Sequence, residues 1–337
     1  MIEGIGGPEM AAAEATILDS LDSMSVMGLV EGVRSLPVHL HLLRKVRQRL
    51  GKHSYDLAVL IDYPGFHLRV AAAARRAGVP VLYFIAPQMW AWGESRVRSL
   101  RENVAALAVI LPFEEQFFRN RGVEAEFVGH PLLDRPIGNN SAALRVEWNM
   151  SAKAPVLGLL PGSRSSEVRR LWPAFRDAAI ELRHAEPGVQ IVVAAKPGIR
   201  YPGGDGFVFV RDRSRDVLTA SDVAICKSGT TTLEAALLET PMVVAYRLHP
   251  LTYVVARQAI RVSNIGLVNL LAGRTVAPEL IQQQVTAENL FETVRPLLDR
   301  SGEAATEQRR ALGEIRDKLG RPGVSGRVAD LACRLVV

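Results

Sequence analysis

Short apolar runs alternate with amphipathic stretches along most of the chain. Residues 156–160 form one such run, and continuous apolar runs are typical of parallel strands that helices cover on both faces. Comparable runs lie at 56–61, 79–85, 105–111, 124–128, 190–195, 207–210, 223–226 and 242–246. Many of these runs are separated by stretches in which apolar residues recur at helical spacing. The alternation predicts an α/β protein made of two Rossmann-like, doubly wound domains.

A turn-rich stretch divides the two series of strands. Residues 135–151 contain proline, glycine and three asparagines, which predicts a linker. It separates a first domain over 1–134 from a second domain over 152–300. Residues 301–337 are expected to form helices, and two placements are open for them: back on the first domain, or against a partner chain in a homodimer.

The N-terminal segment has a different pattern. It opens on a glycine-rich turn at 4–10 with no strand before it, although a doubly wound domain normally begins with a strand. A basic amphipathic helix is expected within 24–52, because leucines and valines recur there at helical spacing and arginines and lysines fill the other positions. This helix either packs on a sheet as a crossover or adsorbs on anionic lipid.

The run at 156–160 ends in Pro161 and Gly162 and leads directly into a predicted helix. A helix N-terminus after a glycine turn at the carboxyl end of a strand is an anion-binding arrangement. Ser163 can cap the free amides, and Arg164 adds a planar donor fork suited to phosphate. The alternative is an ordinary turn with a surface arginine.

A second glycine turn has the same design. Ser228, Gly229 and Thr230 follow a predicted strand, and a helix starts directly on them. The free amides and hydroxyls of this turn predict a second anion cradle, so a single diphosphate could lie between the turns at Gly162 and Gly229. Glu234, one turn into the helix, can accept a hydrogen bond from a sugar hydroxyl.

Asp62 is the candidate for acid–base chemistry. It directly follows the run at 56–61, and the carboxyl ends of strands are where open α/β sheets bind ligands. Pro64 and Gly65 predict a tight turn that exposes the carboxylate. Two roles stay open from spacing alone: a general base, or a cap for the following helix.

The stretch 86–93 holds Trp90 and Trp92 and has neither helical nor strand periodicity. Aromatic side chains in a loop indicate contact with sugar faces, acyl chains or an interface, with a buried loop anchor as the alternative.

The amino-acid composition limits the classes of binding partner that are expected. The 337 residues carry 48% hydrophobic side chains, which is enough for two domains with large cores. The net charge of +6 favours anionic partners, but no nucleic-acid module is recognisable, so nucleic acid is not expected. Two cysteines without metal-ligand spacing suit a reducing cytoplasm. Neither a spanning helix nor a signal peptide is predicted.

Ten motifs, in one order along nearly the whole chain, resemble the lipid-A-disaccharide synthase family of nucleotide-sugar glycosyltransferases. They are GIGGPEM at 4–10, MGLVEG at 27–32, IDYPGF at 61–66, PQMWAW at 87–92, RVRSL at 96–100, LPFEEQFF at 111–118, FVGHPLLD at 127–134, LLPGSRSSEV at 159–168, SGTTTLEAALLETPMVVAYR at 228–247 and NLLAGRTVAPELIQ at 269–282.

The resemblance implies the GT-B fold, in which two Rossmann-like domains face a cleft. It also implies a reaction: a diacylglucosamine unit passes from UDP to the 6-hydroxyl of diacylglucosamine 1-phosphate, giving a β-1,6 disaccharide and UDP with inversion. No metal and no cofactor are expected. The expected location is the cytoplasmic surface of the inner membrane, with anionic lipid as a further partner.

The resemblance also assigns roles to residues. Asp62 is the expected base. The second domain is expected to hold the UDP-sugar. Glu234 is expected to contact the ribose, and Asn269 and Gln282 are expected to lie near the donor sugar. The remaining UDP-binding residues are Gly162, Ser163, Arg164, Ser228, Gly229 and Thr230. The acceptor or lipid side is expected to involve Trp90, Trp92 and Arg96.

The chain also departs from the family pattern. It lacks the family's first strand and Gly-Glu-x-Ser-Gly-Asp turn, so either the start is mis-set or the first sheet is incomplete. Around the acceptor cleft, usual family residues are replaced by Gly65, His67, Ala86, Gly93 and Val268. Two rival functions follow: a UDP-N-acetylglucosamine transferase with another lipid acceptor, or a degenerate, non-catalytic nucleotide-sugar-binding protein.

Overall fold

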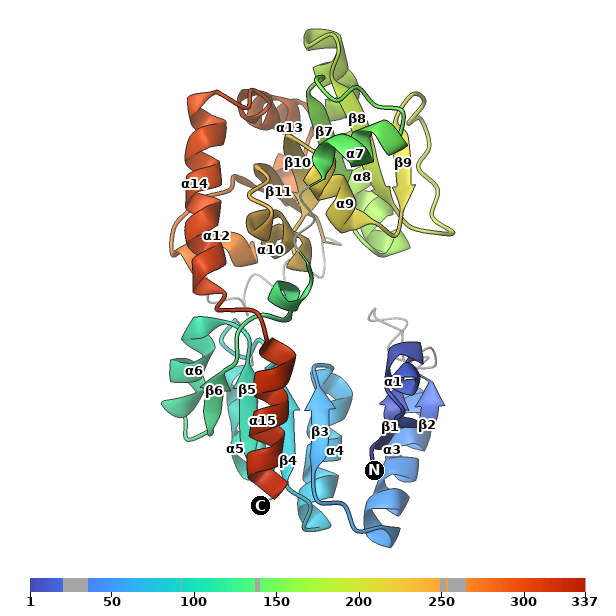
Figure 1. Ribbon diagram of the computed structural model, residues 1–337, viewed down its shortest axis with the longest axis vertical. Helices are drawn as coiled ribbons and strands as arrows, with labels where there is room; N and C mark the ends of the chain where they lie inside the picture. Colours follow the sequence, from blue (N-terminus) through green and yellow to red (C-terminus); the bar gives the residue numbers. More distant parts are fainter. Residues whose placement is uncertain (21–35, 92, 137–139, 249–252, 254–264, 337) are drawn as a thin grey trace.

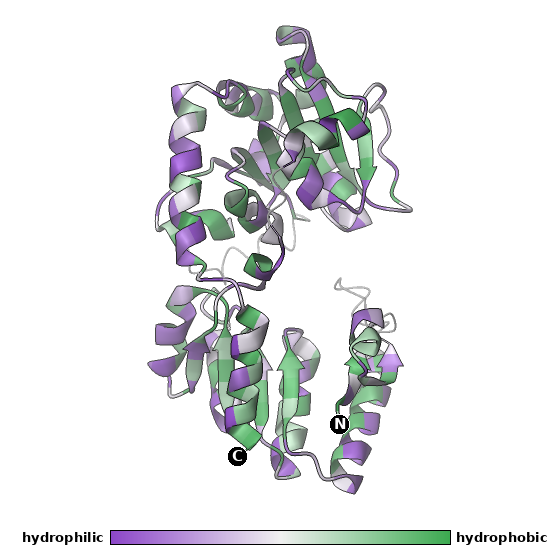
Figure 2. Ribbon diagram, in the orientation of Figure 1, coloured by the Kyte–Doolittle hydropathy of each residue, from purple (hydrophilic) through white to green (hydrophobic). Residues whose placement is uncertain are grey.

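The computed structural model describes residues 1–20, 36–91, 93–136, 140–248, 253 and 265–336. The described chain forms two α/β lobes stacked along the long axis of the molecule (Figure 1). Apolar residues concentrate in the strands, and the outward faces of helices such as α14 (Glu303–Lys318) are largely hydrophilic (Figure 2). This distribution is expected for sheets that are buried between helices.

The second domain contains a six-stranded parallel sheet in the order β9-β8-β7-β10-β11-β12. The chain runs outward from β7 to β9, returns to the middle, and runs outward again from β10 to β12. This is the doubly wound order, in which the strand order reverses between β7 and β10. The strands are β7 (Val156–Leu160), β8 (Gln190–Ala195), β9 (Val208–Arg211), β10 (Val223–Lys227), β11 (Met242–Tyr246) and β12 (Glu279–Ile281).

Helices cover both faces of this sheet. One hydrophobic cluster joins residues of α8 and α13 to the sheet, and another joins residues of α10, α12 and α14 to it. The helices are α7 (Ser141–Glu147), α8 (Ser165–Ala185), α9 (Ser214–Ala220), α10 (Thr230–Leu237), α12 (Leu267–Ala272), α13 (Ala287–Val294) and α14. All five residues of β7 are buried, as its apolar run predicts.

A buried ion pair holds the start of β7. Arg145 of α7 is 1% exposed and lies 3.0 Å from the carboxylate of Asp222, which is 3% exposed. The same guanidinium donates to carbonyls of Ala152, Ala154 and Ala220, so its donors are satisfied. The linker region is thereby tied to the amino ends of β7 and β10, the two central strands of the second sheet.

The first domain has a four-stranded parallel sheet, β3-β4-β5-β6, and a separate parallel pair, β1-β2. The strands are β1 (Glu3–Gly6), β2 (Thr16–Ser20), β3 (Ala58–Ile61), β4 (Val81–Phe84), β5 (Ala106–Val109) and β6 (Ala125–Phe127). The helices are α1 (Pro8–Ala12), α3 (Leu36–Lys52), α4 (Pro64–Arg76), α5 (Val97–Asn103) and α6 (Pro112–Arg119).

The N-terminal prediction needs two corrections. The segment read as a glycine turn without a strand forms a small β-α-β unit, because Glu3–Gly6 pairs with Thr16–Ser20. The predicted helix within 24–52 is observed from Leu36, and residues 21–35 lie outside the described part. On this helix Leu42 and Leu43 are buried, whereas Leu40, one of the leucines that recur at helical spacing, is 44% exposed.

The C-terminal helices divide between the two domains. Helix α14 packs against α10 and α12 of the second domain, and α15 (Val324–Val336) crosses back to lie on the first sheet (Figure 1). Val324 and Leu331 of α15 share a buried cluster with Leu82 of β4 and Ala108 of β5. The last helix is thus part of the first domain's core.

Asp134 fixes the start of α15. Its carboxylate accepts hydrogen bonds from the backbone N–H groups of Gly323, Val324 and Ser325 at 2.7, 3.0 and 2.9 Å, and from the Ser325 hydroxyl at 2.9 Å. Partial burial acts to raise the pKa of Asp134, but these donors outweigh it and lower the pKa to about 2. A carboxylate at a helix N-terminus is a strong cap.

We expect Asp134→Ala to lower the free energy of unfolding by about 1 kcal/mol at pH 7, the usual value of an N-cap. Because the folded pKa is depressed, this contribution is present above the ordinary aspartate pKa and disappears as the pH falls from about 4 to 2. Denaturant unfolding at pH 7 and pH 2.5 measures it, with Asp134→Asn, which keeps one acceptor oxygen, as the control. An equal difference at both pH values would contradict this assignment.

Candidate functional site

Both glycine turns lie at the reversal point of the second sheet. The first connects β7 to α8 and the second connects β10 to α10, and β7 and β10 are adjacent. Gly162 has φ +126°, and a Cβ there would lie 2.6 Å from a carboxylate oxygen of Glu167, so only glycine fits. Gly229 has φ +149°. The predicted turns are therefore brought together at the carboxyl edge of the sheet.

The two turns line one cavity of about 280 Å³. Its walls are formed by Leu160, Gly162, Ser163, Arg164, Glu167, Ala194, Ala195, Lys196, Asp212, Ser214, Lys227, Gly229, Thr230 and Thr231. Three cationic side chains belong to this set, and Lys196 is paired with Asp212 at 2.9 Å. A cavity with several cations, two glycine turns and two helix N-termini suits a phosphorylated ligand.

Glu167 occupies the anion cradle. One carboxylate oxygen accepts from the backbone N–H groups of Ser163 and Arg164 at 3.1 and 3.4 Å. The other lies 3.1 Å from Arg164 Nη1 and 3.1 Å from Lys227 Nζ. Burial acts to raise the pKa of Glu167, but Lys227 and the other donors lower it overall. These donors bind a carboxylate in the structure and have the chemistry that binds phosphate.

The sequence reasoning missed Lys196, Lys227 and Glu167. Lys227 is the last residue of β10 and Lys196 directly follows β8, so both stand at the ligand-binding edge of the sheet. A search for charged residues at every predicted strand end could have found the two lysines. Glu167 is three residues after Arg164, the spacing of a helix capping box.

Ser228 is engaged elsewhere. It is buried, its backbone N–H donates to the carbonyl of Ala245 at 3.0 Å, and its hydroxyl contacts the carbonyl of Ile265 at 3.4 Å. In the structure the Ser228 amide continues the β10–β11 ladder. Its predicted contact with phosphate stays a prediction. Gly229 and Thr230 do line the cavity, and Thr230 is exposed.

Glu234 lies on α10, one turn beyond the cavity wall, and is partly buried. Burial raises the pKa of this carboxyl, and the charges of Arg135, Arg215 and Lys196 partly oppose the rise. The cations that act on Glu234 therefore come from the linker, the end of β8 and helix α9.

Asn269 has both ends of its amide engaged within the protein. The side chain is fully buried, its nitrogen donates to Ala277 and Glu279, and its oxygen accepts from the N–H groups of Val276 and Ala277. The amide thus holds the loop before β12. A direct contact with a donor sugar, as predicted, would require these bonds to break.

Gln282 has a comparable structural role. It is 6% exposed with φ +54°, and its side chain bonds the N–H and the carbonyl of Leu248 at 2.6 and 3.3 Å. It holds the chain just beyond β11. Like Asn269, it holds a loop through hydrogen bonds to the protein backbone.

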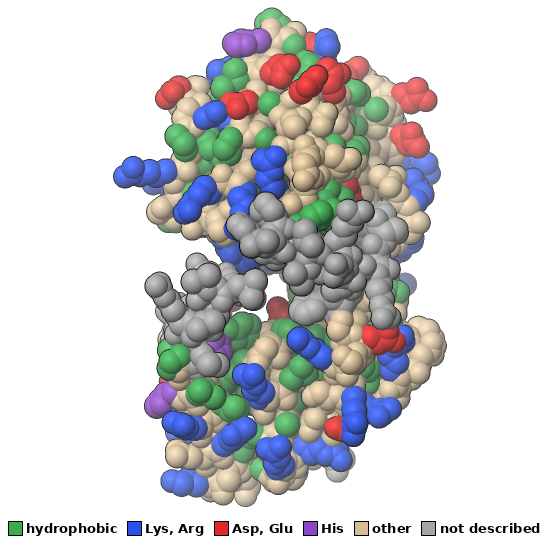
Figure 3. Space-filling view, turned by 180° about the vertical axis from the view of Figure 1, so that it is seen from behind, with side chains coloured by type: hydrophobic (Ala, Val, Ile, Leu, Met, Phe, Trp, Pro, Cys, Tyr) green, Lys and Arg blue, Asp and Glu red, His purple; other side chains and the backbone are tan. Residues whose placement is uncertain are grey.

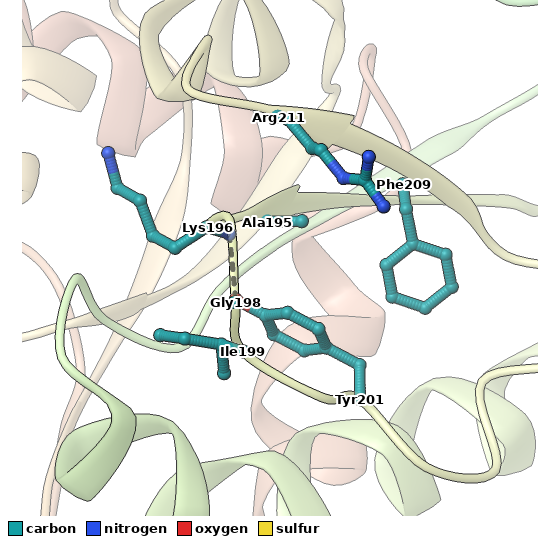
Figure 4. Close-up of a pocket in the computed structure, with 7 residues that line it drawn as sticks. All are labelled: Ala195, Lys196, Gly198, Ile199, Tyr201, Phe209 and Arg211. Carbon is teal, nitrogen blue, oxygen red and sulfur yellow. Dashed lines mark hydrogen bonds between the residues drawn. The ribbon is translucent and has the colours of Figure 1, made fainter.

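A second cavity of about 210 Å³ continues from the first, since Ala195 and Lys196 line both. Tyr201, Phe209 and Arg211 gather on one side of it, and the Lys196 side chain extends away from them (Figure 4). The Tyr201 and Phe209 rings lie 5.6 Å apart, and the Tyr201 hydroxyl accepts the Lys196 N–H at 3.0 Å. An aromatic and arginine surface beside a phosphate cradle suits a planar heterocycle.

In the first domain Asp62 directly follows β3 and is exposed. Helix α4 begins two residues later, and its N-cap is Tyr63 rather than Asp62. Helix capping, the alternative role, is therefore not what the Asp62 side chain does. The strand ends of this sheet face the second domain, because β6 leads directly into the linker (Figure 1).

Trp90 lies half-buried against α6. Its indole Nε1 donates to Glu114 at 2.9 Å, and its ring packs edge-to-face on Phe113 at 5.1 Å. Burial raises the pKa of Glu114 to about 7, against the lowering effect of the Trp90 bond. This is the loop-anchor arrangement. Arg96 is exposed, and Trp92 lies outside the described residues.

Comparison with known proteins decides the family. The model for lipid-A-disaccharide synthetase matches residues 1–321. The chain belongs to this family. It has lipid-A-disaccharide synthase activity, a glycosyltransferase step of lipid A biosynthesis.

Curated relatives agree along almost the full length. The lipid-A-disaccharide synthase of Myxococcus xanthus is 39% identical over 342 residues, which covers 99% of this chain and 89% of that protein. The synthase of Trichlorobacter lovleyi is 41% identical over 345 residues, with coverage of 99% and 89%.

Solved structures share the fold. A UDP-GlcNAc 2-epimerase from Neisseria meningitidis, bound to UDP-GlcNAc, matches with a TM-score of 0.67 at 12% identity, over 96% of this chain and 87% of that one. A spinosyn forosaminyltransferase matches with a TM-score of 0.58 at 15% identity, over 99% and 91%. The predicted GT-B fold class is confirmed.

The described residues lack two features. None of their helices is long and apolar enough to cross a membrane. They also contain no group of three or more His, Cys, Asp or Glu side chains placed to hold a metal ion.

We expect Gly162→Ala to be more destabilising than Gly188→Ala. Both glycines have positive φ, +126° and +101°, but a Cβ at Gly188 has no neighbour within 4 Å, whereas at Gly162 it meets Glu167. The strain common to both is about 1 kcal/mol. Denaturant unfolding measures the free energy of unfolding of both variants, and the difference between them reports the contact with Glu167. Equal losses of stability would show that this close approach does not constrain the turn.

Proposed function

We propose that the chain transfers a 2,3-diacylglucosamine unit from UDP to the 6-hydroxyl of 2,3-diacylglucosamine 1-phosphate, forming the β-1,6 disaccharide 1-phosphate and UDP with inversion. Family membership gives the reaction class. The cavity between the two glycine turns is the observation that carries the donor assignment, because its cations and helix N-termini suit a diphosphate.

The diphosphate lies between the turns at Gly162 and Gly229. Arg164 and Lys227 release Glu167 and pair with phosphate oxygens, and the N–H groups of the α8 N-terminus add neutral donors. As the glycosidic bond to UDP breaks, negative charge grows on the β-phosphate. Cations already fixed beside that oxygen stabilise the departing UDP more than the bound donor.

The nucleoside extends from the phosphate cradle into the adjoining cavity. Uracil lies against the Tyr201, Phe209 and Arg211 surface, and Glu234 accepts a ribose hydroxyl. Asn269 and Gln282 support the donor side by holding the loops at β11 and β12. Both are positioning residues in this proposal.

Asp62 is the base that accepts the proton of the acceptor hydroxyl. Asp62 is exposed and directly follows β3, whose carboxyl end points toward the second domain (Figure 1). A base on the domain opposite the donor can approach the sugar on the side away from UDP, which an inverting displacement requires. The Trp90 loop and Arg96 contribute to the acceptor side.

The first domain is the membrane-facing part. Val38 and Leu40 of α3 are 38% and 44% exposed, and the same helix carries Arg44, Lys45, Arg47, Arg49 and Lys52. Exposed apolar side chains beside cations favour an anionic lipid surface. Figure 3 shows many Lys and Arg side chains on one face of this lobe. The proposed location is the cytoplasmic face of the inner membrane.

Arg164→Ala should weaken UDP binding by about ten- to a hundredfold, since a charge-assisted bond contributes roughly 1.5–3 kcal/mol. Arg169→Ala is the matched control, because Arg169 is an exposed arginine of α8, the helix that begins directly after Arg164, and does not line the cavity. Titration calorimetry with UDP measures both. Equal affinities of the two variants would remove Arg164 from the donor site.

Asp62→Ala should keep UDP affinity within about twofold and reduce disaccharide formation by at least about a hundredfold. Asp56→Ala, which changes an exposed aspartate near the opposite end of β3, should retain activity. The assay combines UDP-diacylglucosamine and diacylglucosamine 1-phosphate and detects the disaccharide. Full turnover by Asp62→Ala would exclude it as the base. UDP binding without product in the unmodified chain would favour a non-catalytic binding protein.

A further inference from the structure

The backbone at Asp62 is strained. Asp62 and Tyr63 have φ values of +52° and +50°, so two adjacent residues with side chains adopt the left-handed region. Such a conformation is strained, and it persists only where the surroundings impose it. The strain occurs at the candidate base, directly before α4.

Four hydrogen bonds fix this segment. The Asp62 N–H donates to the carbonyl of Phe84 at 2.8 Å. The Asp62 carbonyl accepts two bonds, from His67 Nδ1 and from the Tyr83 hydroxyl, each at 2.7 Å. The Tyr63 hydroxyl bonds His39 Nε2 at 2.6 Å, and the two rings stack at 5.7 Å. Hydrogen bonds therefore hold both the N–H and the carbonyl of Asp62.

The Asp62 carboxylate itself has no hydrogen-bond partner among the described residues, so its main chain is fixed and its reactive group is left for a ligand.

The two donors to the Asp62 carbonyl come from buried surroundings. Tyr83 is 0% exposed on β4, and the rings of Tyr63, Phe66 and Tyr83 all contact His67. A carbonyl oxygen only accepts, so His67 carries a proton on Nδ1. Burial lowers the pKa of His67 and raises the pKa of Tyr83, so the imidazole is neutral and the phenol protonated at pH 7.

We propose that His67 and Tyr83 are positioning residues that clamp the Asp62 carbonyl and thereby aim its carboxylate at the acceptor hydroxyl. This inference rests on the proposed function, in which Asp62 is the base. Neither side chain touches the reacting atoms. Their effect is geometric: relaxation of the left-handed turn would rotate the Asp62 side chain away from its position at the strand end.

Four variants separate positioning from general stability. Tyr83→Phe removes only a hydroxyl, and His67→Leu removes the ring donor. His67→Asn restores an N–H donor near the position of Nδ1. Tyr55→Phe is the control, because it removes another hydroxyl of the same domain, which bonds Glu3. We measure kcat, the KM for the UDP-sugar, UDP affinity and the thermal unfolding midpoint of each.

Positioning predicts that kcat falls by about ten- to a hundredfold in Tyr83→Phe and His67→Leu. The donor KM and UDP affinity stay within about twofold, and His67→Asn recovers most of the lost kcat. Tyr55→Phe keeps the kcat of the unmodified chain. If the first two variants lower only the unfolding midpoint, or if His67→Asn shows no recovery of kcat, the proposal is wrong.

A spectroscopic readout distinguishes this inference from the proposed function. The ¹⁵N chemical shifts of the His67 ring report which nitrogen carries the proton, whether or not product forms. The clamp requires the neutral Nδ1–H tautomer at pH 7, and the Nε2–H tautomer would overturn it. If the ring shows Nδ1–H but the unmodified chain makes no disaccharide, the base role of Asp62 fails and the positioning claim fails with it.

Discussion

The proposed donor site depends on one topological constraint, the reversal of strand order between β7 and β10. Because the chain winds outward in opposite directions from these two strands, the helices that follow them leave toward opposite faces of the sheet. Their N-termini and glycine turns remain next to each other at the strand ends. Backbone amides, helix dipoles and strand-end lysines therefore converge on one cavity without a long loop to organise them.

Glu167 balances the positive charge of this cavity. Its carboxylate, from the first turn of α8, pairs with Arg164 and Lys227 and accepts from two backbone amides. In the proposed donor complex a diphosphate takes over these partners, so one anion replaces another. A carboxylate plays a similar role in the first domain. Asp134 accepts hydrogen bonds from the amides at the start of α15 and so links this C-terminal helix to the first half of the chain.

The sequence was sufficient for features determined by local chemistry. The buried run at 156–160, the turns at Gly162 and Gly229, and the place of Asp62 after a strand all depend on residues adjacent in the chain, and the structure has them as predicted. The N-terminal strand escaped prediction because Glu3–Gly6 is half glycine, a residue that is depleted in strands.

Contacts between distant residues could not be predicted in the same way. Whether the Asn269 amide faces a ligand or a neighbouring loop depends on where residues 276–279 fold, and the four protein bonds of its amide are visible only in the structure. The same holds for the Ser228 amide, which pairs with β11, and for His67, whose partner is a backbone carbonyl. Residue type and spacing indicate polarity at these positions but not which partner satisfies it.

A crystal structure of the chain with UDP tests the central claim most directly. The account predicts a diphosphate between the turns at Gly162 and Gly229, within hydrogen-bonding distance of Arg164 and Lys227, with the Glu167 carboxylate displaced from both. UDP bound outside this cavity, with Glu167 still paired to Arg164 and Lys227, would contradict it.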